Sequence, residues 1–228
     1  MQLPYDDTFF AGLEPGSARS ASVVVPLVLR HFPAQSVVDV GCGVGAWLAE
    51  FSRHGVNECL GIDGDYVPRA RLMIPQTSFH TCDLASFSPR GRRFDLACSL
   101  EVAEHLPPAC AVPFVRSLVE LAPVVLFSAA IPGQGGTGHL NEQWQSYWGG
   151  LFRDLGYVGV DCVRPAVFND ERVALWYRQN AIVYCLPDRV PSGLFPMTRA
   201  YEFDRVDLDL WRARQPTPKT RGLRRLFK

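Results

Sequence analysis

The sequence lacks the features that mark several large classes of protein. It has no apolar run of about 18 residues, the length that a membrane-spanning helix needs. Its opening, MQLPYDDTFF, lacks the basic and apolar regions of a secretory signal. Its 23 basic and 23 acidic residues balance, so no net field draws it to nucleic acid or anionic lipid. These absences argue against stable membrane insertion and a nucleic acid partner, and they predict a cytoplasmic protein.

The seven cysteines also lack any pairing pattern. They are odd in number and scattered, and they form neither a CxxC pair nor a Cys/His cluster. Several lie in apolar runs, as at 96–98 and 184–186, where a reduced thiol packs as a small hydrophobic group. The cysteines therefore predict no disulfide framework, no metal site and a reducing compartment.

The length of 228 residues suits one domain, and a change in composition separates this domain from a C-terminal segment. After residue 186 the apolar periodicity fades and prolines recur, and the end carries seven bases without an acid. We predict a domain over 1–186 and an extended basic appendage over 187–228. Such a tail is either a solvated end or a docking element for a partner, a membrane or nucleic acid. Its bases are Arg212, Arg214, Lys219, Arg221, Arg224, Arg225 and Lys228.

Strand and helix signals alternate along the domain. Such alternation, with nearly continuous apolar strands, predicts a parallel sheet covered by helices on both faces, with ligands beyond the carboxyl ends of its strands. A first helix is expected over 17–32, with Ser17 as its N-cap. Strands are expected at 36–40, 58–62, 77–81, 94–99, 123–127, 157–163 and 180–186, and further helices at 46–54, 108–121 and 142–155.

A glycine turn, GCGVG at 41–45, follows the first strand. Gly41, Gly43 and Ala46 fit the dinucleotide fingerprint, and Asp63 lies about twenty residues on, where an acid holds a ribose. The turn alone leaves a nicotinamide and another adenosine-bearing cofactor open.

Acidic residues at successive strand ends decide between these cofactors. Asp39 lies two residues before the first glycine, where it would repel a pyrophosphate. Asp39, Asp63 and Asp83 instead match a cationic ligand that carries a ribose and an adenine. S-adenosylmethionine, with its ammonium and sulfonium groups, fits this series.

Four segments between residues 37 and 107 resemble the successive motifs of class I S-adenosylmethionine-dependent methyltransferases: VVDVGCGVGAWL, GIDGDYV, CDLASF and FDLACSLEVAEHLP. The resemblance implies an α/β fold, a Rossmann-like seven-stranded mostly parallel sheet with helices on both faces and an antiparallel last strand. It also implies S-adenosylmethionine as the cofactor.

The same resemblance assigns residues to parts of the cofactor. The methionyl part would lie among Asp39, Gly41, Gly43 and Gly45, and the ribose at Asp63 beside Gly64. The adenine would lie at Asp83 and Leu84, and the sulfonium above Ser99, Leu100 and Glu101, with His105 in the turn that follows.

Three residues are candidates for catalysis. His139 lies in the glycine-rich loop after the fifth strand, and its imidazole, oriented by Asn141 or Glu142, could deprotonate a hydroxyl. Alternatively, it caps the next helix or binds substrate. Glu101 and His105 either take part in the chemistry or, four residues apart on a short helix, pair with each other.

Residues beyond the fifth strand are candidates for an acceptor pocket. Aromatic side chains such as Trp144 and Trp176 could line it, whereas Trp148 and Phe152 have the spacing of core residues. Arginines could anchor an anionic acceptor, namely Arg164, Arg172 and Arg178.

The sequence thus predicts an S-adenosylmethionine-dependent methyltransferase acting on a small-molecule acceptor. O-methylation of a natural-product or glycan-type substrate is favoured because His139 offers a base. The alternative is a catalytically silent cofactor-binding or docking module that uses the basic tail to engage a partner, a membrane or nucleic acid.

Overall fold

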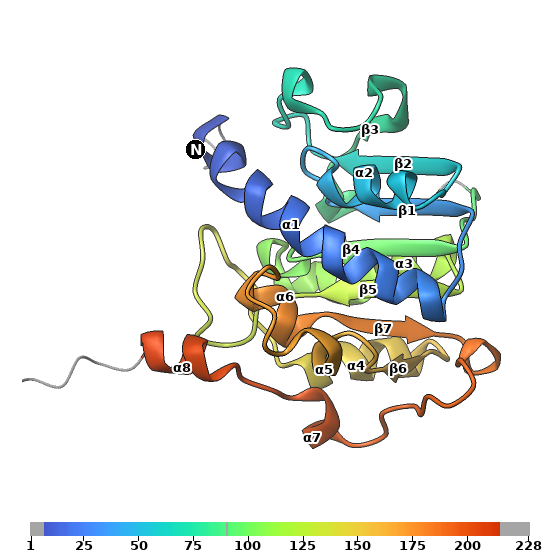
Figure 1. Cartoon of the computed structure of the whole chain (residues 1–228), viewed down its shortest axis with the longest axis vertical. Helices are drawn as coiled ribbons and strands as arrows, with labels where there is room; N and C mark the ends of the chain where they lie inside the picture. Colours follow the sequence, from blue (N-terminus) through green and yellow to red (C-terminus); the bar gives the residue numbers. More distant parts are fainter. Residues whose placement is uncertain (1–6, 90, 215–228) are drawn as a thin grey trace, which may run out of the picture.

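A seven-stranded sheet forms the centre of the protein in the computed structural model, which describes residues 7–89 and 91–214. In order across the sheet, the strands are β3 (Phe79–Thr81), β2 (Glu58–Asp63), β1 (Ser36–Val40), β4 (Leu96–Leu100), β5 (Val124–Ser128), β7 (Ile182–Cys185) and β6 (Val158–Val160). Pairings among the first five strands are parallel, and β7 runs antiparallel to both of its neighbours, as its reversed arrow shows in Figure 1. The predicted Rossmann-like sheet with an antiparallel last strand is confirmed.

All seven predicted strands are present, and β3, β4, β6 and β7 are shorter than their predicted ranges. The main helices are α1 (Asp7–His31), α2 (Ala46–Arg53), α3 (Ala111–Leu121) and α4 (Gln145–Asp154). Shorter ones are α5 (Arg164–Val167), α6 (Leu175–Asn180), α7 (Ala200–Phe203) and α8 (Leu208–Arg214).

Single 3₁₀ turns join several of these elements. They are η1 (Arg69–Arg71), η2 (Gln76–Ser78), η3 (Leu84–Ser86), η4 (Ala103–His105), η5 (Pro108–Cys110) and η6 (Pro187–Arg189). Two of them, η3 and η4, follow the ends of β3 and β4 on the side where the candidate site lies.

The first helix begins earlier than predicted. It starts at Asp7 and continues through Pro15, so Ser17 is an interior residue and the expected N-cap is wrong. One turn further on, the side chains of Arg19 and Ser20 donate hydrogen bonds to the carbonyls of Pro15 and Gly16. The helix then packs along α2 and the sheet (Figure 1).

The sheet separates two apolar cores. One face is covered by α1 and α2, with Val24, Val28 and Phe51 fully or almost fully buried. The other face is covered by α3 and α4, with Trp148 and Phe152 buried against Phe127. Trp148 and Phe152 are therefore core residues, as their spacing predicted. This packing fixes the strand ends from which the candidate site is built.

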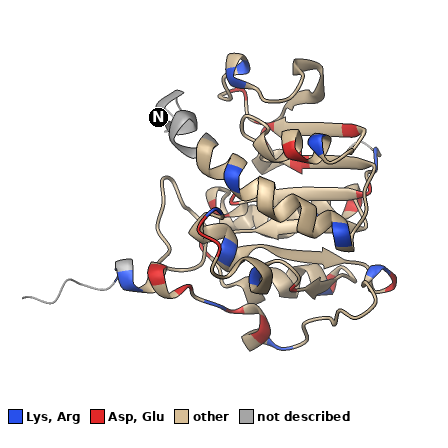
Figure 2. Ribbon diagram, viewed as in Figure 1, with Lys and Arg blue, Asp and Glu red and all other residues tan. Residues whose placement is uncertain are grey.

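The described part of the C-terminal segment lies against the domain. Met197 pairs with Gly159 beside β6, and Phe203 is buried in the core that α4 covers. Residues 187–214 thus include two short helices and the buried Phe203, whereas most of their other large apolar side chains are exposed. The bases from Lys219 onwards lie outside the described residues. In the rest, positive and negative residues are interspersed (Figure 2).

Arg164 fastens this segment to the domain. Its guanidinium is almost completely buried, pairs with Asp161 at 2.8 and 2.9 Å, and donates to the backbone carbonyls of Glu202 and Phe203. Asp161 keeps a second partner, the half-exposed Arg205 at 3.2 Å. Four donated bonds from one side chain therefore hold two distant stretches of chain together.

Replacing Arg164 with methionine should destabilise the protein, because it leaves Asp161 partly unpaired and two buried carbonyls without donors. We expect the free energy of unfolding, measured by urea denaturation, to fall by about 3 kcal/mol. The control is Arg153→Met, which breaks an exposed pair with Asp154 and should change that free energy by less than about 0.5 kcal/mol. Equal effects of the two substitutions would contradict a fastening role for Arg164.

Candidate active site

A cavity of about 680 Å³ lies beyond the carboxyl ends of the parallel strands. This volume is in the range of pockets that hold cofactors and small ligands. Its walls come from the turns after β1, β2, β3 and β4, the glycine-rich loop after β5, and parts of α1 and α6. Of the residues predicted to contact the cofactor, the lining includes Asp39, Gly41, Gly43, Asp63, Gly64, Asp83, Leu84 and Leu100.

Asp39 is a buried acid that faces this cavity. Its side chain is 2% exposed near the end of β1. Burial, with a smaller effect of the charge of nearby Asp63, raises the pKa of Asp39 to about 8. A carboxyl group in this state gains a favourable partner when a cation enters the cavity.

Asp63 closes the glycine turn at the end of β2. Its Oδ2 accepts a hydrogen bond from the Gly43 amide at 2.7 Å, and its Oδ1 accepts bonds from the Gly64 amide and the Tyr66 hydroxyl, both at 2.6 Å. Burial raises the pKa of Asp63, and these three hydrogen bonds lower it. Since Tyr66 also lines the cavity, Asp63 already binds a hydroxyl on the cavity side.

The glycines of the turn are required by their backbone and surroundings. Gly41, Gly43 and Gly45 all have positive φ angles, 89°, 53° and 84°. A side chain at Gly41 would overlap Val102, and one at Gly45 would overlap Ile74. Gly45 is not part of the cavity lining, so its contact here is with the core.

The residues predicted to contact the adenine and the sulfonium differ in whether they are buried and in whether they line the cavity. Leu84 is buried at the cavity wall, whereas Asp83 is exposed and accepts bonds from the Ala85 amide and Ser86 hydroxyl. Asp83 therefore caps the η3 turn. Ser99 is fully buried within β4 and does not line the cavity; Leu100, the last residue of that strand, does.

Glu101 has the one non-glycine positive φ among the described residues, 56°. This left-handed conformation is costly for a residue with a side chain and marks a constrained position. The Glu101 amide donates to the Ser128 carbonyl and hydroxyl, at 3.0 and 3.1 Å, which ties the end of β4 to that of β5.

The Glu101 carboxylate ends a buried amide network. It accepts hydrogen bonds from Gln134 at 2.9 Å and Asn180 at 3.2 Å, and Gln134 in turn accepts from Gln179 and Asn180. Glu101 lies outside the η4 turn that contains His105, so the two do not share a helix as the sequence suggested. The amide network joins the glycine-rich loop to the start of β7.

Glu104 was not singled out from the sequence, yet it is the most deeply buried acid of the cavity. It is fully buried, and neither carboxylate oxygen has a hydrogen bond of normal geometry from the described residues. Burial raises the pKa of Glu104 well above its usual value, and the charge of neighbouring Glu101 raises it further. The EVAEH motif alone does not say that this second glutamate points inward.

Two histidines lie beside Glu104. The rings of His105 and His139 meet edge to face, with their centroids 4.9 Å apart. His139 Nδ1 lies 2.8 Å from Glu142 Oε1, so Glu142 is the partner that orients this imidazole. Burial, with a smaller effect of His139, lowers the pKa of His105 to about 4. All three candidate catalytic residues, Glu101, His105 and His139, therefore line one cavity.

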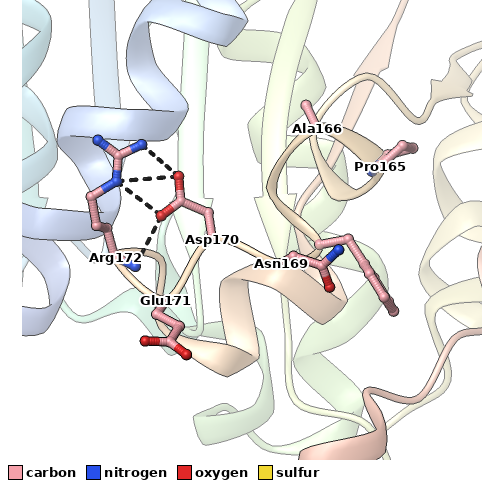
Figure 3. A pocket seen from close by; sticks show the side chains of 7 residues that line it. Pro165, Ala166, Asn169, Asp170, Glu171 and Arg172 are labelled. Carbon is pink, nitrogen blue, oxygen red and sulfur yellow. Dashed lines mark hydrogen bonds and ion pairs between the residues drawn. The ribbon is translucent and has the colours of Figure 1, made fainter.

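The arginines proposed as acceptor anchors are engaged elsewhere. Arg164 is buried and pairs with Asp161, as described above, and Arg178 lies 3.8 Å from Asp207. Arg172 pairs with Asp170 at 2.6 Å on the rim of a shallow second pocket formed by the loop after α5 (Figure 3). None of the three lines the main cavity, so an acceptor there would have to be bound by other groups.

The aromatic candidates divide between the cavity and its surroundings. Trp176 and Tyr177 line the cavity, and the Tyr177 hydroxyl lies 3.3 Å from Ser17 of α1. Trp144 is about two-fifths exposed and lies outside the lining. The α6 helix therefore supplies the aromatic wall that the sequence expected in part from α4.

The family of the chain follows from comparison with known proteins. Residues 17–154, which span every cofactor motif described above, match the family model described as a methyltransferase domain. The chain belongs to the class I methyltransferases. The cofactor of this family is S-adenosylmethionine, as the acidic residues at the strand ends indicated.

Individual relatives of this methyltransferase act on different acceptors. The dTDP-3-amino-3,4,6-trideoxy-alpha-D-glucopyranose N,N-dimethyltransferase of Streptomyces venezuelae is 29% identical over 160 residues, 69% of this chain and 62% of the relative. The chloroplastic tocopherol O-methyltransferase of Arabidopsis thaliana is 30% identical over 96 residues, 39% of this chain and 27% of the relative. The chain thus spans less than two thirds of either.

A solved structure supports the fold. The crystal structure of DesVI from Streptomyces venezuelae matches with a TM-score of 0.54 at 18% identity, covering 79% of this chain and 96% of that one. At this identity the match concerns the fold alone. Among the described residues, no helix has the length and apolar character that crossing a membrane requires.

Proposed function

We propose that this methyltransferase transfers the methyl group of S-adenosylmethionine to a hydroxyl of a small-molecule acceptor, and that it works in the cytoplasm. The observation that carries the proposal is the cluster of Glu104, His105 and His139 in the same cavity as the glycine turn. Hydroxyl acceptors benefit from proton removal, and this cluster offers groups that promote it.

The residues present fit the cofactor. The sulfonium supplies an already activated methyl group, so the protein has mainly to bind and align the two reactants. Asp39, buried and facing the cavity, suits the ammonium of the methionyl part. Asp63, which already accepts a hydroxyl bond from Tyr66, suits the ribose hydroxyls, and Leu84 offers apolar surface for the adenine.

The acceptor is proposed to enter on the side formed by the glycine-rich loop and α6. This side joins the apolar Trp176 and Tyr177 rings to the imidazole of His139. His139 is held by Glu142, which also accepts hydrogen bonds from the amides of Gly133 and Gly135. The loop and the ring are therefore positioned together. We propose that His139 promotes loss of the proton from the acceptor hydroxyl.

An amine acceptor is the second candidate, and the Streptomyces venezuelae relative, named as an N,N-dimethyltransferase, favours it. A neutral amine attacks without a base. The two acceptors therefore differ in how strongly turnover depends on His139.

Incubation with nucleotide-activated sugars, amino sugars and phenols, using cofactor with a deuterated methyl group, tests the activity. Mass spectrometry should detect a labelled methyl ether. A labelled amine would replace the hydroxyl proposal by the second candidate. Normal cofactor binding with no labelled product from any hydroxyl or amine would favour a silent binding module.

Substituting His139 by alanine should lower kcat for a hydroxyl acceptor by about a hundredfold or more, because proton transfer by a positioned group contributes about 10²–10⁴. The dissociation constant of S-adenosylhomocysteine should change by less than about twofold, since the substitution removes no proposed cofactor contact. His80→Ala, which removes an exposed imidazole on β3, is the matched control. Retained turnover in His139→Ala would exclude the proposed role.

A further inference from the structure

We infer that Glu104, His105 and His139 form a binding site for a divalent first-row transition metal ion. The ligand atoms of the three side chains lie within 4.8 Å of one another. In tetrahedral or octahedral coordination, neighbouring ligands bound about 2.1 Å from one ion lie about 3.0–3.4 Å apart, so the widest pair has to close by at most about 1.8 Å.

The Glu104 carboxylate is the observation that points to an ion. It is fully buried at the cavity wall, with no hydrogen bond of normal geometry to either oxygen from the described residues. Buried acids are normally paired or bound to metal. Neighbouring Glu101 is itself an acid, held by Gln134 and Asn180, so it cannot balance a negative charge on Glu104.

The supporting contacts are those of a metal site. Metal-bound histidines usually give their second ring nitrogen to a carboxylate or a carbonyl. His139 Nδ1 meets Glu142 at 2.8 Å, and His105 is hydrogen bonded to the Gly138 backbone. Hence each imidazole has the kind of outer partner that orients a ligand.

The backbone holds the three side chains in place before an ion binds. The Glu104 carbonyl accepts hydrogen bonds from the amides of Leu140 and Asn141, at 2.7 and 2.9 Å. These bonds fasten the loop that carries His139 to the η4 turn that carries Glu104 and His105. Two histidines and one carboxylate from two adjacent segments therefore meet without a large rearrangement.

The donor set selects the kind of ion. Two imidazoles and one carboxylate suit Mn²⁺, Fe²⁺, Co²⁺ or Zn²⁺ better than Mg²⁺ or Ca²⁺, which prefer oxygen. Three protein ligands leave positions open toward the cavity. An acceptor hydroxyl bound to the ion at such a position would have a lower pKa. This consequence rests on the proposed function: His139 would promote loss of the acceptor proton by holding the ion.

The site is tested by titrating the full chain with Mn²⁺ and monitoring the EPR signal of the free ion. One ion per chain is expected, with ¹⁴N modulation from the imidazoles in the bound ion's spectrum. The His105→Ala/His139→Ala variant should lose this modulation and bind at least about a hundredfold more weakly. Glu104→Gln should also weaken binding, and Glu142→Gln by about 10–100-fold.

Two further measurements keep the result interpretable. His80→Ala should bind Mn²⁺ like the unmodified protein, and S-adenosylhomocysteine binding reports whether each variant is folded. Failure of the unmodified protein to bind Mn²⁺ and Zn²⁺ at millimolar concentration would overturn the site, as would unchanged binding by the folded double variant. Because no acceptor is present, a failure of the proposed methyl transfer leaves this result unaffected.

Discussion

Replacing Asp63 with alanine is expected to weaken S-adenosylhomocysteine binding about a hundredfold. Two hydrogen bonds from ribose hydroxyls to a carboxylate are each worth about 1.5–3 kcal/mol, and a loss of about 2.7 kcal/mol corresponds to a hundredfold change in affinity. The same carboxylate also holds the Gly43 and Gly64 amides, so its removal loosens the turn that receives the cofactor. Isothermal titration calorimetry measures the effect.

Asp65→Ala provides the control for charge. Asp65 lies two residues further on, its side chain is 90% exposed, and its partner is Arg69 at 3.3 Å. Removing it changes the net charge as much as Asp63→Ala does and should leave the affinity within about twofold. The unmodified protein should show no binding of NAD. Equal affinities of the Asp63→Ala and Asp65→Ala variants would contradict the ribose role of Asp63.

The cofactor side of the site was largely predictable because its spacing is set by regular structure. A parallel strand places its last residues at one edge of the sheet, so acids at the ends of β1 and β2 meet wherever the strands pair in register. The glycine turn could likewise be located, since its positive φ angles demand glycine. Ser99 was misjudged because β4 extends one residue past it.

The acceptor side depends on tertiary contacts that a single sequence does not reveal. The inward position of Glu104 follows from the η4 turn and from its bonds to Leu140 and Asn141, 36 and 37 residues away along the chain. Spacing rules for metal sites look for ligands close in sequence, and His139 is distant from EVAEH. The burial of Arg164 is of the same kind, because its carbonyl partners, Glu202 and Phe203, belong to the distant helix α7.

Asp39 should make cofactor binding depend on pH. With a pKa of about 8, most Asp39 carboxyls carry a proton at pH 7, whereas a bound ammonium group favours the carboxylate. Binding of S-adenosylhomocysteine, which keeps that ammonium, should therefore release about one proton at pH 7. Its affinity should rise about tenfold per pH unit up to about pH 8. Calorimetry in two buffers with different protonation enthalpies measures the released proton.

The same proton affects stability without the cofactor. The unfolded chain loses it near pH 3.8, whereas the folded protein keeps it to about 8, so Asp39 favours the folded state at low pH and this contribution is lost as pH rises between these values. Asp39→Asn keeps the shape of the side chain and cannot titrate. The variant should bind S-adenosylhomocysteine more weakly and release about one proton fewer on binding. Its free energy of unfolding should also decline less between pH 3.8 and about pH 8. Proton release unchanged in Asp39→Asn would assign the titration to another acid of the cavity, with Asp63 the nearest candidate.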